Sequence, residues 1–112
     1  MTQSTADQYL QVVTTIDSEA AARQLARGIV DARLAACAQV LSPITSTYWW
    51  KGEVEVADEW MIVIKTTAAR FAELAAHIKA NHSYETPEIT ATPITEGNPD
   101  YLGWISAEVR GR

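Results

Sequence analysis

The segment Trp60–Ile64 constrains the fold more than any other feature, because all five of its residues are apolar. The alternating residues Glu53–Val56 begin a strand that is predicted to run on through Trp60–Lys65. Successive side chains of a strand point to opposite faces of the sheet, so this strand needs cover on both faces. An antiparallel sheet with one solvated face would instead alternate apolar and polar residues. The adjacent Trp49 and Trp50 raise the same requirement.

Further strand and helix patterns alternate along the chain. Tyr9–Thr15 is rich in β-forming residues and is read as the first strand. Asp17 is the expected N-cap of a first helix, whose apolar positions follow a helical period: Ala22, Leu25, Ala26, Ile29 and Val30. The extended stretch 36–50 contains Pro43, which predicts a bulge or an edge position. Lys51-Gly52 then predicts a tight hairpin turn.

The second half of the chain continues the pattern. Thr66 or Thr67 is the expected cap of a second helix, whose apolar positions are Phe71, Leu74, Ala75 and Ile78. Glu88–Ile94 predicts a fourth strand, and Asn98-Pro99 predicts the start of a short last helix. The order is β-α-β-β-α-β plus a terminal helix, which is an α+β, ferredoxin-like sandwich with a long hairpin.

Two alternatives remain for covering the second sheet face. A second subunit could pack on it, or the short C-terminal helix could fold over it within one chain. We favour a subunit contact, because an exposed hairpin carrying Tyr48, Trp49 and Trp50 would form a large aromatic patch. Residues 1–8 are mostly polar and are expected to form a disordered leader, so a single domain is expected over residues 9–112.

Composition excludes several classes of function. The chain has 112 residues and a net charge of −5, so it has no electrostatic basis for binding nucleic acid. Its longest apolar runs are five residues, too short to cross a membrane. The first basic residue is Arg23, which argues against a secretory signal, and the lone Cys37 fits a reducing compartment. We therefore expect a cytoplasmic protein.

The loop segment His82–Glu88 concentrates the side chains most suited to chemistry: an imidazole, a phenol and carboxylates. Nitrogen and oxygen ligands of this kind suit transition metals, although composition alone favours a solvated loop with an ordinary histidine. No catalytic motif is found. Cys37 is expected to be a buried, unreactive hydrophobe. The acidic residues of the hairpin arm are expected to form a solvated face: Glu53, Glu55, Asp58 and Glu59.

Five short motifs in register resemble the divalent-cation tolerance protein CutA family: Leu34-Ala35-Ala36-Cys37, Tyr48-Trp49-Trp50-Lys51-Gly52, Ile64-Lys65-Thr66, Tyr84-Glu85-Thr86-Pro87-Glu88 and Gly97-Asn98-Pro99-Asp100-Tyr101-Leu102 with Trp104. The resemblance covers about residues 9–106. It implies a ferredoxin-like subunit that forms a homotrimer through its hairpin strands, as in the signalling protein PII. It also implies a role in tolerance of copper and other divalent metals.

The resemblance also implies where a metal would bind. Two positions that hold metal ligands in some bacterial relatives are Thr14 and Asn81 here, which leaves His82 with Glu88 nearby in sequence. Weak binding of copper or another divalent metal is therefore the leading hypothesis. The alternative is a PII-like sensor of a small molecule, bound between subunits in a pocket of four residues: Trp50, Lys65, Tyr84 and Glu88. An enzyme using the same pocket is the third hypothesis, with Glu88 as acid or base and Lys65 as an anion anchor.

Overall fold

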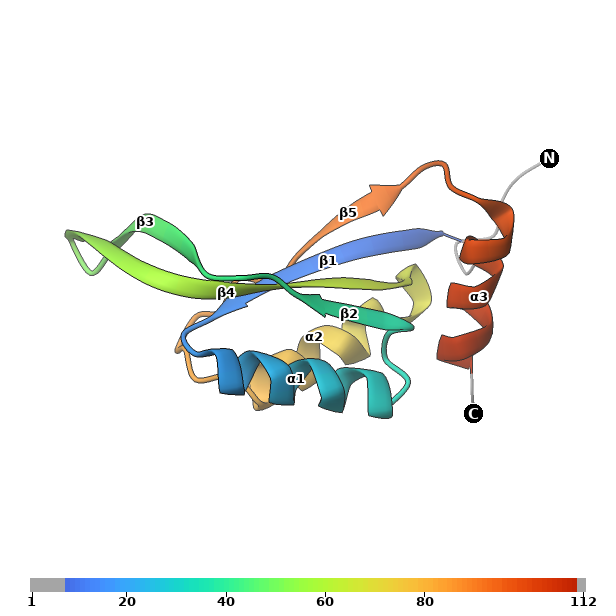
Figure 1. Ribbon diagram of the computed structural model, residues 1–112, viewed down its shortest axis with the longest axis horizontal. Coiled ribbons are helices and arrows are strands. Elements are labelled where there is room, and N and C mark those ends of the chain that lie inside the picture. Colours follow the sequence, from blue (N-terminus) through green and yellow to red (C-terminus); the bar gives the residue numbers. More distant parts are fainter. Residues whose placement is uncertain (1–7, 111–112) are drawn as a thin grey trace.

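The computed structural model describes residues 8–110, and the predicted leader lies outside the described residues except for Gln8. The fold is α+β, as predicted, with one antiparallel sheet and three α-helices (Figure 1). The elements follow one another in this order: β1 (Tyr9–Ile16), α1 (Glu19–Asp31), β2 (Cys37–Val40), β3 (Ile44–Trp50), β4 (Glu53–Thr67), the 3-10 helix η2 (Ala68–Arg70), α2 (Phe71–Ala80), β5 (Thr90–Ile94) and α3 (Pro99–Arg110).

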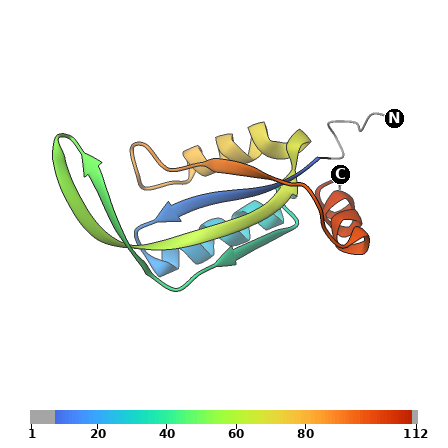
Figure 2. The same cartoon turned by 90° about the horizontal axis from the view of Figure 1, so that it is seen from above.

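The long strand β4 organises the sheet, in which the strand order is β2-β4-β1-β5. The C-terminal half of β4 pairs with β1 and β2, and its N-terminal half pairs with β3 alone. Val40 pairs with Ile62 and Ile44 pairs with Glu59, so three residues between the paired positions oppose only two on β4. That extra residue is the bulge predicted around Pro43. Figure 2 shows the β3–β4 hairpin projecting beyond the ends of α1 and α2.

Helices α1 and α2 cover one face of the sheet (Figure 1). The side chains that meet between the layers are almost fully buried: Val12, Ile16, Ile62 and Ile64 from the sheet, and Leu25, Ile29, Leu74 and Ile78 from the helices. Each fully buried side chain of this size contributes roughly 1.5–3 kcal/mol through its removal from water. The helical period correctly predicted Leu25, Ile29, Leu74 and Ile78 as core positions, but it was wrong for Val30, which is 37% exposed.

Local signals set most of the element boundaries. Lys51 and Gly52 both have positive φ, 52° and 84°, which is the geometry of a two-residue hairpin turn. Asn98 caps α3 as predicted, because its Oδ1 accepts the N–H of Asp100 at 3.0 Å. The predicted cap of α1 was wrong: Ser18, not Asp17, accepts the N–H of Ala21 at 3.1 Å.

The other face of the sheet has no helix over its centre among residues 8–110 (Figure 1). Val13 pairs with Val63 on this face, and Met61 lies one pleat further along β4, and all three side chains are only partly buried. Helix α3 lies at one end of the sheet, where the Tyr9 hydroxyl contacts Ser106 Oγ at 2.7 Å. The terminal helix therefore covers only the end of this face. No helix within the described part of the chain is long and apolar enough to span a membrane.

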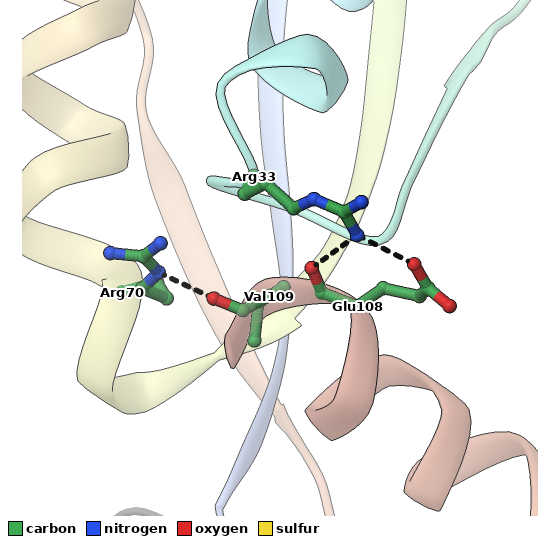
Figure 3. A network of polar contacts seen from close by, with 4 residues as sticks. All are labelled: Arg33, Arg70, Glu108 and Val109. Carbon is green, nitrogen blue, oxygen red and sulfur yellow. Dashed lines mark hydrogen bonds and ion pairs between the residues drawn. The ribbon is translucent and has the colours of Figure 1, made fainter. Parts of the chain in front are cut away.

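Two arginines fix the C-terminal end of α3 (Figure 3). Arg33 Nη1 donates to the backbone oxygen of Glu108 at 3.1 Å and to its Oε1 at 2.7 Å. Arg70 Nε donates to the backbone oxygen of Val109 at 3.0 Å. The last carbonyls of a helix carry partial negative charge, so two guanidinium groups are favourable there.

Candidate functional site

The loop between α2 and β5 folds against the base of the β3–β4 hairpin. Tyr84 in this loop donates its hydroxyl proton to Glu59 Oε2 at 2.6 Å. Glu59 is only 6% exposed, so the prediction that it belongs to a solvated acidic face was wrong. The reason is its position on β4: it shares the uncovered sheet face with Met61, and the loop closes over that part of the face.

His82 holds this loop in place through both of its ring nitrogens. Its Nδ1 accepts the N–H of Tyr84 at 3.0 Å, and its Nε2 lies 2.9 Å from the backbone oxygen of Thr15. An amide N–H can only donate and a carbonyl can only accept, so Nδ1 is the acceptor and Nε2 the donor in these two contacts. Nε2 also lies 3.4 Å from the hydroxyl of Thr14. The histidine thus ties the loop to the end of β1.

The Tyr84 phenol is a persistent donor. Burial raises its pKa well above the usual value for tyrosine, and the hydrogen bond to Glu59 and the charges of Glu59 and Asp17 raise it further. The ring also lies against His82, with 4.9 Å between the ring centroids. At neutral pH the Tyr84 phenol therefore keeps its proton and donates it to Glu59.

Next to this pair is a groove of about 680 Å³ between the hairpin and the loop. Its lining is aromatic, acidic or hydroxyl-bearing: Thr15, Ser46, Thr47, Tyr48, Trp49, Trp50, Glu59, Ser83, Tyr84, Glu85, Thr86 and Glu88. Trp50, Tyr84 and Glu88, three of the four residues of the predicted pocket, meet here. Within one chain Lys65 does not line the groove, and its Nζ donates to Gln39 Oε1 at 3.1 Å instead.

The predicted metal ligands are placed differently from one another. Glu88 is exposed at the groove, where its Oε2 accepts the hydroxyl proton of Thr90 at 3.1 Å. His82 is not among the lining residues, and its nitrogens are engaged as described above. Across residues 8–110 no group of three or more His, Cys, Asp or Glu side chains is placed to hold one metal ion. Any metal bound by His82 and Glu88 would thus take part of its coordination from water.

The residues predicted to form a subunit interface lie on the exposed hairpin. Trp49 is 74% exposed, and Tyr48 and Trp50 are each 39% exposed. Val54 and Val56 on the paired strand are also largely exposed, so the hairpin presents an apolar surface to solvent in a single chain.

Cys37 is partly buried, so the prediction of full burial was wrong. Its partner across the sheet is Lys65, which places it on the face opposite α1 and α2 rather than in the core. Tyr101 of α3 lies beside it. Burial raises the pKa of the Tyr101 phenol, and the Cys37 thiol raises it further. The thiol therefore sits under the edge of the terminal helix.

Glu59 is the main residue of the groove that the sequence interpretation missed. The sequence did contain a signal that Glu59 could be covered. Glu59 comes directly before Trp60–Ile64, in which every residue is apolar, and it is two residues from Met61, so both side chains point to the same face of β4. Glu53, Glu55 and Glu59 are separated by even numbers of residues, so they share one face of β4. Tyr48 and Trp50 pair with Glu55 and Glu53 and therefore lie on that face too. What the sequence could not supply was the contact with Tyr84, 25 residues away.

Comparisons with known proteins match nearly the whole chain. A family model described as CutA1 divalent ion tolerance protein matches residues 10–108. The divalent-cation tolerance protein CutA of Thermus thermophilus is 45% identical over 94 residues, covering 84% of this chain and 91% of that protein. The protein of the same name from Citrobacter koseri is 39% identical over 99 residues, covering 88% and 86%. The crystal structure of CutA1 from Oryza sativa superposes with a TM-score of 0.89 at 38% identity, over 94% of this chain and 96% of that one.

Proposed function

The chain belongs to the CutA1 divalent ion tolerance family, and on that basis we propose that it acts in tolerance of divalent metal ions by binding them weakly. Copper is the metal we favour, because a nitrogen and oxygen site follows the general affinity order in which Cu(II) binds more tightly than its neighbours. The observation that supports the proposal is family membership across nearly the whole chain.

We further propose that the working form is a homotrimer of ferredoxin-like subunits resembling PII. The strand order, with β4 and β1 adjacent in the middle of the sheet, fits the ferredoxin-like plan. The uncovered face around Val13 and Val63 and the exposed hairpin around Trp49 both need a partner surface. A second copy of the same chain supplies complementary surfaces of this kind without another gene product.

The geometry of His82 explains why metal binding would be weak. A metal needs a free lone pair, so it must displace the Tyr84 N–H from Nδ1 or the proton from Nε2. Either route breaks a hydrogen bond that holds the loop. Glu88 can contribute a carboxylate oxygen, and water completes the coordination.

Calorimetric titration with Cu(II) tests this proposal. We expect His82→Ala and Glu88→Gln each to weaken binding about tenfold or more, in the range known for loss of a metal-supporting group. His77→Ala is the matched control, because the His77 ring lies on α2 beside Gly28. Binding should also weaken as the pH falls, because an imidazole must be neutral to coordinate a metal. Equal affinity in His82→Ala would remove His82 from the site.

A second function is favoured by one observation, the groove itself. Trp50, Tyr84 and Glu88 meet around a space large enough for a small organic molecule. A PII-like sensor would bind its ligand there, with Lys65 contributed by a neighbouring subunit. Saturable binding of a small molecule by the metal-free protein would favour this function.

A further inference from the structure

We propose that loop 82–88, between α2 and β5, is an autoinhibitory contact: in the closed position seen in the structure it withholds the His82 imidazole from metal ions, and the hydrogen bond between Tyr84 and Glu59 controls its opening. The inference rests on the metal-binding function proposed above and concerns access to the same imidazole. The contacts that carry it join parts of one chain, so they do not depend on what packs against the hairpin in an assembly.

Both ring nitrogens of His82 are occupied in the closed loop. Nδ1 accepts the N–H of Tyr84 at 3.0 Å, and Nε2 donates to the backbone oxygen of Thr15 at 2.9 Å. A neutral imidazole has one ring nitrogen whose lone pair can bind a metal ion, and here that lone pair accepts the Tyr84 N–H. The Tyr84 ring also lies against the imidazole, with 4.9 Å between the ring centroids. The closed loop therefore offers a metal ion no unoccupied nitrogen of His82.

The Tyr84 backbone has to move whichever nitrogen of His82 is used. Coordination at Nδ1 displaces the Tyr84 N–H directly. Coordination at Nε2 leaves the ring proton on Nδ1, where it would face the Tyr84 N–H, and two donors cannot form a hydrogen bond with each other. Access to His82 therefore requires the loop to open at Tyr84.

A second contact of Tyr84 opposes this opening. Its hydroxyl donates to Glu59 Oε2 at 2.6 Å, and Glu59 is only 6% exposed. A buried acceptor that loses its donor is left unsatisfied, which makes such a bond costly to break. Burial and the hydrogen bond to Glu59 raise the pKa of the Tyr84 phenol, so the donor proton is retained at neutral pH. By contrast, the contact of Ser83 with Asp17 is solvent-exposed and contributes less.

The closed loop lowers the apparent affinity for a metal ion by a calculable factor. A ligand that binds only the open state loses affinity in proportion to the fraction of molecules that are open. In the closed state, no three His, Cys, Asp or Glu side chains of the described residues are placed to hold one ion. Weak binding then reflects the closed loop as well as the small number of ligands. Loosening the contact between Tyr84 and Glu59 should strengthen binding.

Chemical modification of His82 measures the open state without any metal. Diethyl pyrocarbonate acylates an imidazole through a ring lone pair, so it requires the same freed nitrogen. At one fixed pH, we expect Tyr84→Phe to speed the modification of His82 about tenfold, because the loss of one hydrogen bond corresponds to roughly that factor. Peptide mass spectrometry gives the rate, and His77 in the same protein is the internal reference.

Tyr9→Phe is the matched control for this variant. It also removes one phenol hydroxyl, which contacts Ser106 Oγ at 2.7 Å, but at the start of β1 rather than near its end, where the loop is bound. We expect the modification rate of His82 to be unchanged. An unchanged rate in Tyr84→Phe, or equal acceleration in both variants, would overturn the inference.

Calorimetric titration with Cu(II) gives a result that loss of structure alone would not produce. We expect Tyr84→Phe to bind Cu(II) more tightly than the wild type, and by the same factor as the acceleration at His82, because both processes require the same open state. A residue that only supports the fold of the site would weaken binding when it is replaced. Equal or weaker affinity in a Tyr84→Phe protein that still binds Cu(II) would overturn the inference.

Hydrogen exchange of the wild-type chain keeps the test decisive if Tyr84→Phe fails to fold. The Tyr84 amide loses its acceptor when His82 is released, so we expect this amide to exchange faster at saturating Cu(II) than without metal. Amides of the buried strand residues Ile62 and Ile64 are the control and should not change. Unchanged or slower exchange at Tyr84 would contradict the proposal.

The inference and the metal-binding function fail separately. Faster modification of His82 in Tyr84→Phe, with no Cu(II) binding by either protein, overturns the metal-binding function and supports the autoinhibitory contact. Unchanged modification in a protein that binds Cu(II) overturns the autoinhibitory contact alone. Faster modification together with tighter Cu(II) binding supports both.

Discussion

The two halves of β4 have opposite environments, although they form one continuous strand. The C-terminal half, paired with β1 and β2, contributes Ile62 and Ile64 to a core that is closed within the chain. The N-terminal half, paired with β3 in the projecting hairpin, exposes Val54 and Val56 (Figure 2). The N-terminal half is apolar at alternate positions, whereas Trp60–Ile64 in the C-terminal half is apolar at every position. The difference shows that its own chain buries the side chains of one half of β4, whereas it leaves the same kind of side chain exposed in the other half.

The groove lies where these two regions meet. Glu59 is the last acidic residue before the buried half of β4, and the loop carrying His82 and Tyr84 closes over it. Ligand chemistry at this boundary can combine rigid positioning from the core with surface from the hairpin. The following predictions test that division, beginning with the largest expected effect.

Truncation in the core should cost far more than truncation in the hairpin. We expect Ile62→Ala to lower the free energy of unfolding by about 2–5 kcal/mol, because the side chain is fully buried between the sheet and α1. Val56→Ala removes an exposed side chain and should change the stability of one subunit by less than about 0.5 kcal/mol. Denaturant unfolding followed by circular dichroism measures both. Comparable losses would mean that the hairpin is part of the same closed core.

Substitutions in the hairpin should affect assembly of the subunits more than the stability of one subunit. We expect the double substitution Trp49→Ser and Trp50→Ser to weaken the proposed trimer about tenfold to a hundredfold, because large aromatic residues often dominate interface energies. Light scattering across a dilution series measures the change. The helix-face variant Lys79→Ser is the control, since Lys79 is exposed on α2. A wild-type chain that remains a monomer at all concentrations would refute the trimer itself.

Tyr84→Phe should destabilise the boundary region by about 1–3 kcal/mol, because Glu59 would lose its hydrogen-bond donor while remaining buried. The raised pKa of Tyr84 adds a pH effect with a defined sign. Above the usual tyrosine pKa of 10.0 the unfolded chain loses this proton and the folded chain keeps it, so stability falls as pH rises through that range. Thermal unfolding of wild type and Tyr84→Phe at several alkaline pH values should show a smaller decline in the variant. Parallel declines would contradict the assignment.

The sequence predicted the parts of this molecule that depend on local or periodic signals. The tight turn followed from Lys51-Gly52, and the core followed from the spacing of apolar positions. Asp17 was mistaken for the cap of α1 because Asp and Ser are both good N-caps and they are adjacent in the sequence. The helix begins at Glu19, so Ser18 is the residue placed to cap it. Instead, Asp17 accepts the Ser83 hydroxyl proton at 3.1 Å, a contact between segments far apart in sequence.

The groove was predicted only in part, for a related reason. Trp50, Tyr84 and Glu88 were identified, but composition alone gave Glu59 the environment of its acidic neighbours. Burial of that one carboxylate depends on where the loop between α2 and β5 folds, and this is fixed by contacts of His82 with Thr15 and Tyr84. Periodicity describes which face a strand residue occupies. It does not describe which loop later covers that face.

The smallest expected effect lies at the end of the core region farthest from the hairpin, where Arg33 holds α3 (Figure 3). Arg33 has φ of 61°, a conformation that favours glycine, and its guanidinium contacts Glu108 on a half-exposed surface. Arg33→Gly should therefore relieve about 1 kcal/mol of backbone strain and lose about as much from the ion pair and the helix cap. We expect a net change within about 0.5 kcal/mol. In the background Glu108→Ala, which already lacks the ion pair, the same substitution should become stabilising. Thermal unfolding of the four proteins of this cycle measures the coupling, and a strongly destabilising Arg33→Gly in both backgrounds would show that the arginine contributes mainly through packing.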